Sequence, residues 1–280
     1  MNELEPGRLV AVARGVRRLV APNPSVMTGP GTNTYLLGEP PVAVIDPGPA
    51  DDIHLANIQR HAPRLEKIFV THTHADHSAG AAALGARTGA RLIGRAAPAA
   101  GPQDRTFRPD LEPQEGESFA LSCGSLRAIY TPGHASNHVC YLLESEALLF
   151  SGDHILDGVT PVIMPPDGVM AAYLDSLSRL TGYALRRIAP GHGKLLTEPH
   201  AVIEAIRAHR LRREAKVLHA LHVGVSARLD ELLVVAYDDV RPELFPLARF
   251  SLEAHLIKLA AEGRCERKGD SWRVNALTSK

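Results

Sequence analysis

Residues 71–77, Thr-His-Thr-His-Ala-Asp-His, place three imidazoles and one carboxylate close together, directly after a short apolar run. Neutral histidine and ionised aspartate are the side chains that borderline divalent metals such as zinc favour. His72 and His74 lie two apart on an extended segment and should face the same way, while Asp76 and His77 follow on the turn beyond the strand. The spacing predicts a metal site at a strand end, in preference to a polar loop whose histidines only bond one another.

The HxHxDH spacing resembles the signature of the metallo-β-lactamase superfamily, and the other ligand motifs of that family follow in order. A Thr-Pro-Gly-His turn ends at His134, a Gly-Asp step carries Asp153, and a Pro-Gly-His-Gly turn carries His192. Each of these residues comes where an apolar run stops. Ligands at the ends of several strands can converge at one edge of a sheet, so the motifs strengthen one another.

The resemblance implies a complete ligand set for two divalent metal ions, with zinc favoured and manganese or iron as the other options. It implies that a hydroxide bridging the two ions attacks the substrate, so the expected chemistry is hydrolysis. Asp76 is expected to orient that hydroxide and accept its proton, which makes it the candidate catalytic residue. By resemblance, one ion is held by His72, His74 and His134, the other by Asp76, His77 and His192, and Asp153 bridges them.

The remaining histidines carry weaker signals. His138 follows His134 by four residues and is open to three interpretations: a hydrogen-bond partner of a ligand, a substrate contact, or a strand-edge residue. His154 directly follows Asp153 and points to the opposite side of an extended strand, which favours a structural role. The others lack ligand spacing and receive no role: His54, His61, His200, His209, His219, His222 and His255.

Length and charge limit the alternatives. The 280 residues suit one larger domain and a small appendage, which we place at residues 1–200 and 201–280. The 31 Lys and Arg balance the 31 Asp and Glu, which disfavours a strongly cationic nucleic-acid binder but leaves room for a local basic patch. The scattered cysteines, the N-terminus without a signal-peptide pattern and the lack of a membrane-length apolar run predict a cytoplasmic protein without a membrane partner. The oligomeric state stays open, a homodimer being one option.

The first part of the chain predicts strands. Residues 9–20 read as one β-type segment, and residues 33–38 and 42–46 as a hairpin pair that ends in an Asp-Pro-Gly turn. Residues 22–32 are rich in proline and glycine and predict a loop. This loop either approaches the metal centre, as the resemblance implies, or is a plain surface connection.

Helices and a second group of strands follow. A strand at residues 67–71 delivers the motif, and a helix at residues 78–85 runs away from it. Two β segments before His134 and two after it predict a second sheet, and residues 170–180 have the apolar spacing of an amphipathic helix. Two runs of strands with helices on both outer faces predict an α+β fold, a four-layer αββα sandwich, and the resemblance implies the same fold.

Beyond residue 200 helical periodicity dominates. Three helices are expected, the second from Ser226 and the third ending before Gly263, and a Gly-Asp turn within residues 264–274 predicts a β-hairpin. Three helices and a hairpin indicate a winged-helix-like domain. Its first helix and hairpin carry arginine and lysine, which fits either a nucleic-acid surface or a solvated charged face with interleaved acids.

The early Gly-Thr-Asn-Thr-Tyr-Leu strand, the Gly-Asp-His step and the winged-helix tail together resemble the β-lactamase-like protein 2 group, near glyoxalase II. Animal members of that group are known as endoribonucleases that prefer single strands. The predicted function is a dinuclear metal-dependent hydrolase that cleaves a phosphodiester, such as single-stranded RNA, or a small ester or thioester. Two alternatives remain: a mononuclear iron sulfur dioxygenase on the same fold, and a nucleic-acid-binding regulator with a vestigial metal site.

Overall fold

The computed structural model describes residues 3–223 and 227–275. Within these ranges the first sheet has six strands, in the spatial order β1-β2-β3-β4-β5-β6. Its strands are β1 (Leu9–Ala13), β2 (Val16–Val20), β3 (Asn33–Gly38), β4 (Pro41–Ile45), β5 (Lys67–Phe69) and β6 (Arg91–Ile93).

Strands β4, β5 and β6 run parallel, and two helices provide the crossovers that parallel neighbours need. Helix α1 (Asp52–His61) joins β4 to β5, and its N-cap residue Asp51 accepts a hydrogen bond from the backbone N–H of His54. Helix α2 (Ala75–Thr88) joins β5 to β6. The carboxyl ends of β4 and β5 therefore open at the same edge of the sheet.

The second sheet has five strands among the described residues, in the order β11-β10-β9-β8-β7. A short 3-10 turn, η1 (Glu144–Glu146), joins β9 to β10, and helix α3 (Met170–Leu180) lies between the parallel strands β10 and β11. The strands are β7 (Ser118–Leu121), β8 (Gly124–Tyr130), β9 (Val139–Leu143), β10 (Leu148–Gly152) and β11 (Arg187–Pro190).

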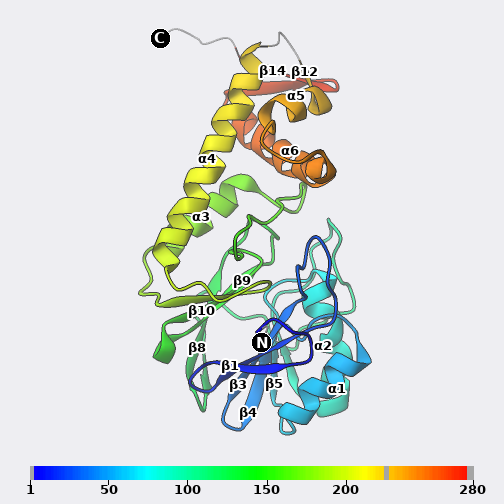
Figure 1. Cartoon of the computed structure of the whole chain (residues 1–280), viewed down its shortest axis with the longest axis vertical. Coiled ribbons are helices and arrows are strands. Elements are labelled where there is room, and N and C mark those ends of the chain that lie inside the picture. Colours follow the sequence, from blue (N-terminus) through cyan, green and yellow to red (C-terminus); the bar gives the residue numbers. More distant parts are fainter. Residues whose placement is uncertain (1–2, 224–226, 276–280) are drawn as a thin grey trace.

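The two sheets pack face to face, and helices cover both outer faces (Figure 1). One apolar cluster lies between the sheets and includes Tyr35, Phe69 and Tyr141. A second cluster packs α1 and α2 on the first sheet, and a third packs α3 on the second sheet. Three apolar layers between four structural layers confirm the predicted αββα sandwich.

The predicted single segment at residues 9–20 is wrong, because the chain turns back at Arg14 and Gly15. Strands β1 and β2 pair antiparallel on either side of that turn. Gly15 has a φ of 65°, and a Cβ atom there would lie 2.7 Å from the Cβ atom of Cys123. Only glycine tolerates both this backbone conformation and this close approach, so an isolated glycine marked a tight hairpin turn.

Within residues 199–223 and 227–275, the C-terminal part forms three α-helices and a small sheet, as the winged-helix prediction expects. Its elements are α4 (Pro199–Val223), β12 (Ala227–Arg228), α5 (Leu229–Ala236), the 3-10 turn η2 (Pro242–Leu244), α6 (Phe245–Ala261), β13 (Cys265–Lys268) and β14 (Ser271–Val274). The three strands lie in the order β12-β14-β13. An apolar cluster of their inward side chains, with Leu252, Leu256 and Trp272, forms a separate core.

The predicted start of the second helix needs correction. Ser226 itself lies outside the described residues, and α5 begins only at Leu229. Ala227 and Arg228 pair with β14 before the helix starts. The Glu231 side chain accepts a hydrogen bond from the backbone N–H of Arg228, which caps the helix at this point.

Helix α4 connects the two parts of the molecule without a break (Figure 1). Ile203 and Ile206 pack into the core beneath α3, and Val217 and Leu221 pack into the C-terminal core. The predicted domain boundary at residue 200 falls in the first turn of this helix and stays a prediction. None of the helices in the described ranges combines the length and the apolar character that a membrane crossing requires.

Candidate metal centre

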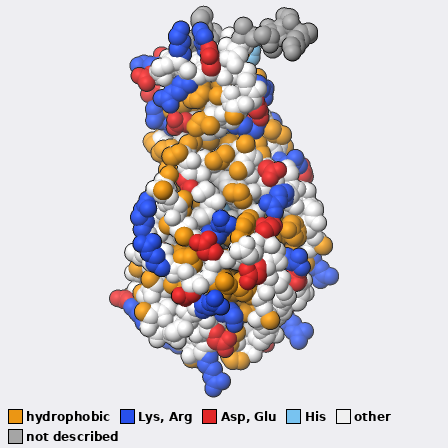
Figure 2. Space-filling view, turned by 180° about the vertical axis from the view of Figure 1, so that it is seen from behind, with side chains coloured by type: hydrophobic (Ala, Val, Ile, Leu, Met, Phe, Trp, Pro, Cys, Tyr) orange, Lys and Arg blue, Asp and Glu red, His pale blue; other side chains and the backbone are white. Residues whose placement is uncertain are grey.

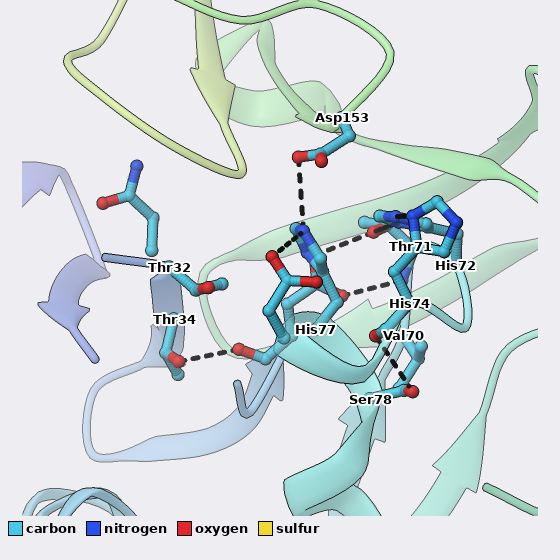
Figure 3. Close-up of polar contacts among 12 residues, drawn as sticks. Thr32, Thr34, Val70, Thr71, His72, His74, His77, Ser78 and Asp153 are labelled. Atoms are coloured by element: carbon cyan, nitrogen blue, oxygen red, sulfur yellow. Dashed lines mark hydrogen bonds and ion pairs between the residues drawn. The ribbon is translucent and has the colours of Figure 1, made fainter. Parts of the chain in front are cut away.

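The seven predicted site residues converge where β5, β8, β10 and β11 end. Asp153 comes directly after β10, and His134 and His192 lie in the loops after β8 and β11. Figure 3 shows Asp153 reaching toward His77, with His72 and His74 beside it. Three overlapping groups place their ligand-type atoms within 4.8 Å of one another: His72, His74 and His134; His72, His77 and Asp153; Asp76, His77 and His192.

The sequence predicted that Asp76 and His77 lie on a turn beyond the strand. This prediction is wrong, because both residues belong to the beginning of helix α2. Strand β5 ends at Phe69, so the chain has room to begin a helix inside the motif, with His74 as its N-cap residue. A carboxylate in the first turn of a helix interacts favourably with the positive end of the helix dipole. The helix thereby directs Asp76 and His77 to one side of the site and leaves His72 and His74 on the other.

His72, His74 and His134 form one compact group of imidazoles. Nδ1 of His74 lies 2.9 Å from Nε2 of His72 and 3.0 Å from Nε2 of His134. Burial holds the pKa of His72 well below its usual value, lowers the pKa of His74 to about 3 and also lowers that of His134. These rings are therefore neutral at physiological pH, and neutral nitrogens that face one common point are the form that binds a metal ion.

Asp76, His77 and His192 form the second group. Oδ2 of Asp76 lies 3.2 Å from Nε2 of His192 and 3.5 Å from Nε2 of His77. Asp153 reaches both groups: its Oδ1 lies 3.2 Å from Nε2 of His77, and its Oδ2 lies 3.8 Å from Nε2 of His134. This is the place that a bridging carboxylate would occupy.

The charges of the second group depend on one another. Burial would raise the pKa of Asp153, but the imidazoles of His192 and His77 outweigh it and hold this pKa well below its usual value. Burial would lower the pKa of His192, but Asp153 and Asp76 raise it to about 9. Burial also opposes protonation of His77, and Asp153, Asp76 and Asp46 overcome it, so its pKa lies well above the usual value. The carboxylates thus require positive charge beside them, which bound cations would also supply.

The outward nitrogens of two predicted ligands bond backbone carbonyl groups. Nδ1 of His134 lies 2.8 Å from the carbonyl oxygen of Val162, and Nδ1 of His192 lies 3.2 Å from that of Gly31. In the neutral form of each ring, a donor hydrogen bond from Nδ1 leaves Nε2 as the unprotonated, inward-facing nitrogen, which is the form that binds a metal ion. Gly31 belongs to the loop at residues 22–32, so the prediction that this loop approaches the site is confirmed.

Asp46 holds the other side of the site, although its place in the sequence predicted only a turn. Its Oδ1 accepts from the backbone N–H of Thr71 at 2.8 Å, and its Oδ2 lies 2.8 Å from Oγ1 of Thr71 and 2.9 Å from Nδ1 of His77. Oγ1 of Thr71 also lies 3.0 Å from Nδ1 of His72. One carboxylate therefore orients an imidazole in each group. The available signal was an aspartate at the end of a buried strand parallel to the motif strand.

The donor set fits divalent metal ions. Nε2 of His77 and Oδ1 of Asp153 are buried and form no hydrogen bond to any described residue, although they lie 3.2 Å apart. Buried polar atoms without a partner are costly, and coordination of a cation would satisfy both. Five imidazoles and two carboxylates are a ligand set typical of zinc, manganese or iron. The His/Asp clusters are consistent with the metal site of this type of fold.

The two histidines beside the motifs lie in the interior. His138 stacks on the ring of His72, with centroids 5.0 Å apart, and its Nδ1 lies 2.9 Å from Oγ1 of Thr131. Its side chain forms no hydrogen bond to a predicted ligand within the described residues, and it lies directly before β9, so the structure fits the interpretation of His138 as a strand-edge residue. His154 packs against the ring of Tyr173, with centroids 4.8 Å apart, in agreement with a structural role.

A cavity of about 660 Å³ opens at His134 and Asp153 and extends toward the C-terminal part. Such a volume falls within the usual range for small-molecule sites. Figure 2 shows hydrophobic side chains gathered on one face where the C-terminal part meets the rest of the molecule. Apolar residues that line the cavity include Leu156, Val159, Val162, Leu244, Leu247 and Ala248.

Comparison with solved structures supports the fold. A metallo-beta-lactamase family protein from Thermus thermophilus has a TM-score of 0.79 and 24% sequence identity, covering 95% of this chain and 100% of that one. A beta-lactamase domain protein from Burkholderia ambifaria has a TM-score of 0.78 and 21% identity, covering 96% of this chain and 94% of that one. Both likenesses extend through the C-terminal part.

Comparison of sequences identifies the family. Residues 27–192 match the metallo-beta-lactamase superfamily, and residues 229–272 match the beta-lactamase associated winged helix domain. A beta-lactamase-like protein 2 homolog of Drosophila melanogaster is 32% identical over 268 residues, which is 89% of either chain. An atrochrysone carboxyl ACP thioesterase of Emericella nidulans is 29% identical over 245 residues, 84% of this chain and 76% of that protein. The chain therefore belongs to the metallo-beta-lactamase superfamily, as a hydrolase of that fold with a C-terminal winged helix domain.

Proposed function

We propose that this hydrolase cleaves a carboxylic thioester or ester with the aid of two divalent metal ions, zinc being the favoured one. His72, His74 and His134 would hold one ion, Asp76, His77 and His192 the other, and Asp153 would bridge them. Two ions held there would acidify a shared water and neutralise charge on the attacked oxygen.

The apolar cavity beside the cluster is the observation on which the proposed substrate class rests. Leu156, Val159 and Val162 line it close to His134 and Asp153. An acyl group attached to a thioester carbonyl is apolar and gains free energy when it leaves water for such a surface. A single-stranded nucleic acid would need a groove of cationic side chains that follows its phosphates.

The two arginines that line the cavity are buried and bonded within the protein. Arg210 is 3% exposed and donates to the carbonyl oxygen of Pro161, and Arg213 is 6% exposed and pairs with Asp239 at 2.7 Å. Elsewhere in the C-terminal part, Arg273 pairs with Glu266. These pairs favour the interpretation of the tail as a charged face with interleaved acids.

Relatives with thioesterase names point the same way. Besides the carboxyl ACP thioesterase, a protein named thioesterase pkgB from Emericella nidulans is 32% identical over 214 residues, which is 74% of this chain and 59% of that protein. The names describe those relatives and not this chain. The two relatives support a thioester as the substrate class of this chain, and they do not identify its acyl group.

Asp76 is the residue that we assign to proton transfer. Its side chain is 28% exposed, the most accessible of the carboxylates in the cluster, so it can face both a water and the substrate. Burial would raise the pKa of Asp76, but His77 and His192 outweigh it and hold this pKa below its usual value. The carboxylate is therefore ionised at neutral pH and can orient a water and accept its proton.

The test is a hydrolysis panel with acyl thioesters, S-lactoylglutathione, single-stranded RNA, bis-p-nitrophenyl phosphate and nitrocefin. Thioester cleavage should disappear in His74→Ala and in wild-type protein whose metal has been removed by a chelator. Addition of zinc to the chelator-treated wild-type protein should restore the activity. His61→Ala is the matched control, because His61 lies at the end of α1, outside the cluster. Cleavage of RNA but of no thioester would refute the proposed substrate, and one bound iron with oxygen uptake would favour the dioxygenase alternative.

A further inference from the structure

We infer that the winged helix domain forms the acyl-binding wall of the active site and selects substrates by the size of their acyl group. The inference rests on the proposed thioester hydrolysis. Its basis is that one cavity is lined both by His134 and Asp153 and by residues of α6 in the C-terminal part. A substrate that reacts at the metal cluster has its acyl end against that helix.

The far wall of the cavity is apolar and comes from α6 and the segment before it. Leu244 precedes α6, and Leu247, Ala248 and Ser251 follow on one side of it, at the three- and four-residue spacing that faces one direction. Val240 lies beside them. The apolar side chains of this wall fit a hydrocarbon chain or ring. Besides those of the metal cluster, the charged and larger polar side chains that line the cavity, His209, Arg210, Arg213 and Tyr237, come from α4 and the end of α5 and not from α6.

The wall is held at a defined position relative to the cluster. Three successive residues of the catalytic part, 161–163, bond to three different partners. Arg210 of α4 donates to the carbonyl oxygen of Pro161. Nδ1 of His134 lies 2.8 Å from the carbonyl oxygen of Val162. The backbone N–H of Ile163 lies 3.4 Å from Oγ of Ser251 on α6. This short segment therefore ties a predicted metal ligand to both α4 and α6, and the depth of the cavity is set by the fold.

Two exposed apolar side chains give a second, independent indication. Val26 and Met27 also line the cavity and are 79% and 48% exposed, which is unusual for large apolar side chains side by side. They belong to a tight loop in which Ser25 and Gly29 exchange backbone hydrogen bonds of 2.9 and 3.2 Å. An acyl group in the cavity would cover these side chains and remove them from water.

Size selection has a measurable form. Each methylene that enters the cavity should raise kcat/KM about fourfold, the equivalent of about 0.8 kcal/mol, until the chain meets the wall formed by α6. Beyond that length the gain should stop or reverse. A series of acyl thioesters from two to twelve carbons, with one common thiol, measures this profile in the zinc-loaded protein.

Ala248→Phe would place a ring in the cavity, and we expect it to lower the ratio of long-chain to two-carbon kcat/KM at least tenfold. Leu247→Ala would enlarge the cavity and should move the optimum to longer chains, so the inference stays testable if the first variant folds poorly. Ala261→Phe is the matched control, because Ala261 is exposed on the same helix and does not line this cavity. The control should keep the wild-type profile.

The outcomes separate the two proposals. Absence of thioester hydrolysis at every chain length in the wild type would overturn the proposed function. Thioester hydrolysis with a profile that neither Ala248→Phe nor Leu247→Ala alters would overturn the size-selection inference and leave the proposed function in place. A profile that changes equally in Ala261→Phe would also overturn it, because the effect would then come from general loss of stability.

Discussion

Replacement of Asp46 by asparagine should weaken the second metal position far more than the first. The carboxylate of Asp46 receives hydrogen bonds from Thr71 and lies 2.9 Å from Nδ1 of His77. Asparagine has the same shape but replaces one acceptor oxygen with an amide NH₂ group. If that group faces His77, it donates to Nδ1 and shifts the ring proton to Nε2, the nitrogen that points at Asp76 and Asp153.

The magnitude follows from this change of tautomer. A ring with its proton on Nε2 cannot bind a metal ion there until the proton is displaced, and loss of such a supporting carboxylate typically lowers metal affinity about 10- to 100-fold. The group around His72, His74 and His134 should suffer less, because Oγ1 of Thr71 can still orient His72. We therefore expect normal loading of one ion and an affinity for the second that is about 10- to 100-fold lower.

Zinc titration by calorimetry, together with metal analysis after gel filtration, measures both affinities. Asp104→Asn is the matched control: Asp104 is 8% exposed and bonds Ser78 and Thr106, and its hydrogen bonds reach none of the seven predicted ligands. Both variants should lose some stability, and only Asp46→Asn should lose affinity for the second ion. Two tightly bound ions in Asp46→Asn, or equal losses in the two variants, would refute the role assigned to Asp46.

Three further predictions test the chemistry and the fold. Asp76→Asn should lower turnover about 100-fold or more with the first metal ion still bound, and near-normal turnover in fully loaded protein would argue against proton transfer by Asp76. Leu256→Ala in the C-terminal core should lower the free energy of unfolding in urea by about 2–5 kcal/mol, whereas Val234→Ala, at a side chain 60% exposed, should have little effect. The hydrogen bond from Arg213 holds the pKa of Asp239 at about 2, below its unfolded value of about 3.9, so this ion pair stabilises the fold above pH 4 and is lost as the pH falls toward 2. Asp239→Asn should accordingly be less stable than the wild type at pH 6 in urea denaturation, and a difference that persists unchanged near pH 2 would contradict the assignment.

The parts of the fold with local signals were predictable. The bounds of α3 agree with the expected helix at residues 170–180, because a long amphipathic pattern reflects one solvent-facing side and one buried side. The sandwich itself could be predicted from two runs of strands with helices between them. The split of residues 9–20 into β1 and β2 was missed, because one glycine within an apolar pattern is a weak signal until its close contact with Cys123 is known.

The parts of the site that consist of side chains in sequence motifs were predictable, and the other parts were not. The seven residues of the cluster belong to motifs with fixed spacing, and the structure brings them together. The groups that orient them include the carbonyl oxygens of Val162 and Gly31, and a backbone carbonyl leaves no trace in a sequence. The cavity was likewise out of reach, because its walls are far apart in the chain and meet only through the placement of α6.

The length of helix α4 fixes the orientation of the C-terminal part relative to the active site, which a flexible loop would not do. Ile206 packs into the catalytic core, Arg210 reaches the cavity, and Val217 packs into the C-terminal core, all on one uninterrupted helix. One inserted residue between Ile206 and Val217 would turn everything beyond it by about 100° and move it by about 1.5 Å. The angular phase of this helix thus sets which side of the tail meets the active site, so the length of this stretch should tolerate no change even where its exposed residues vary freely.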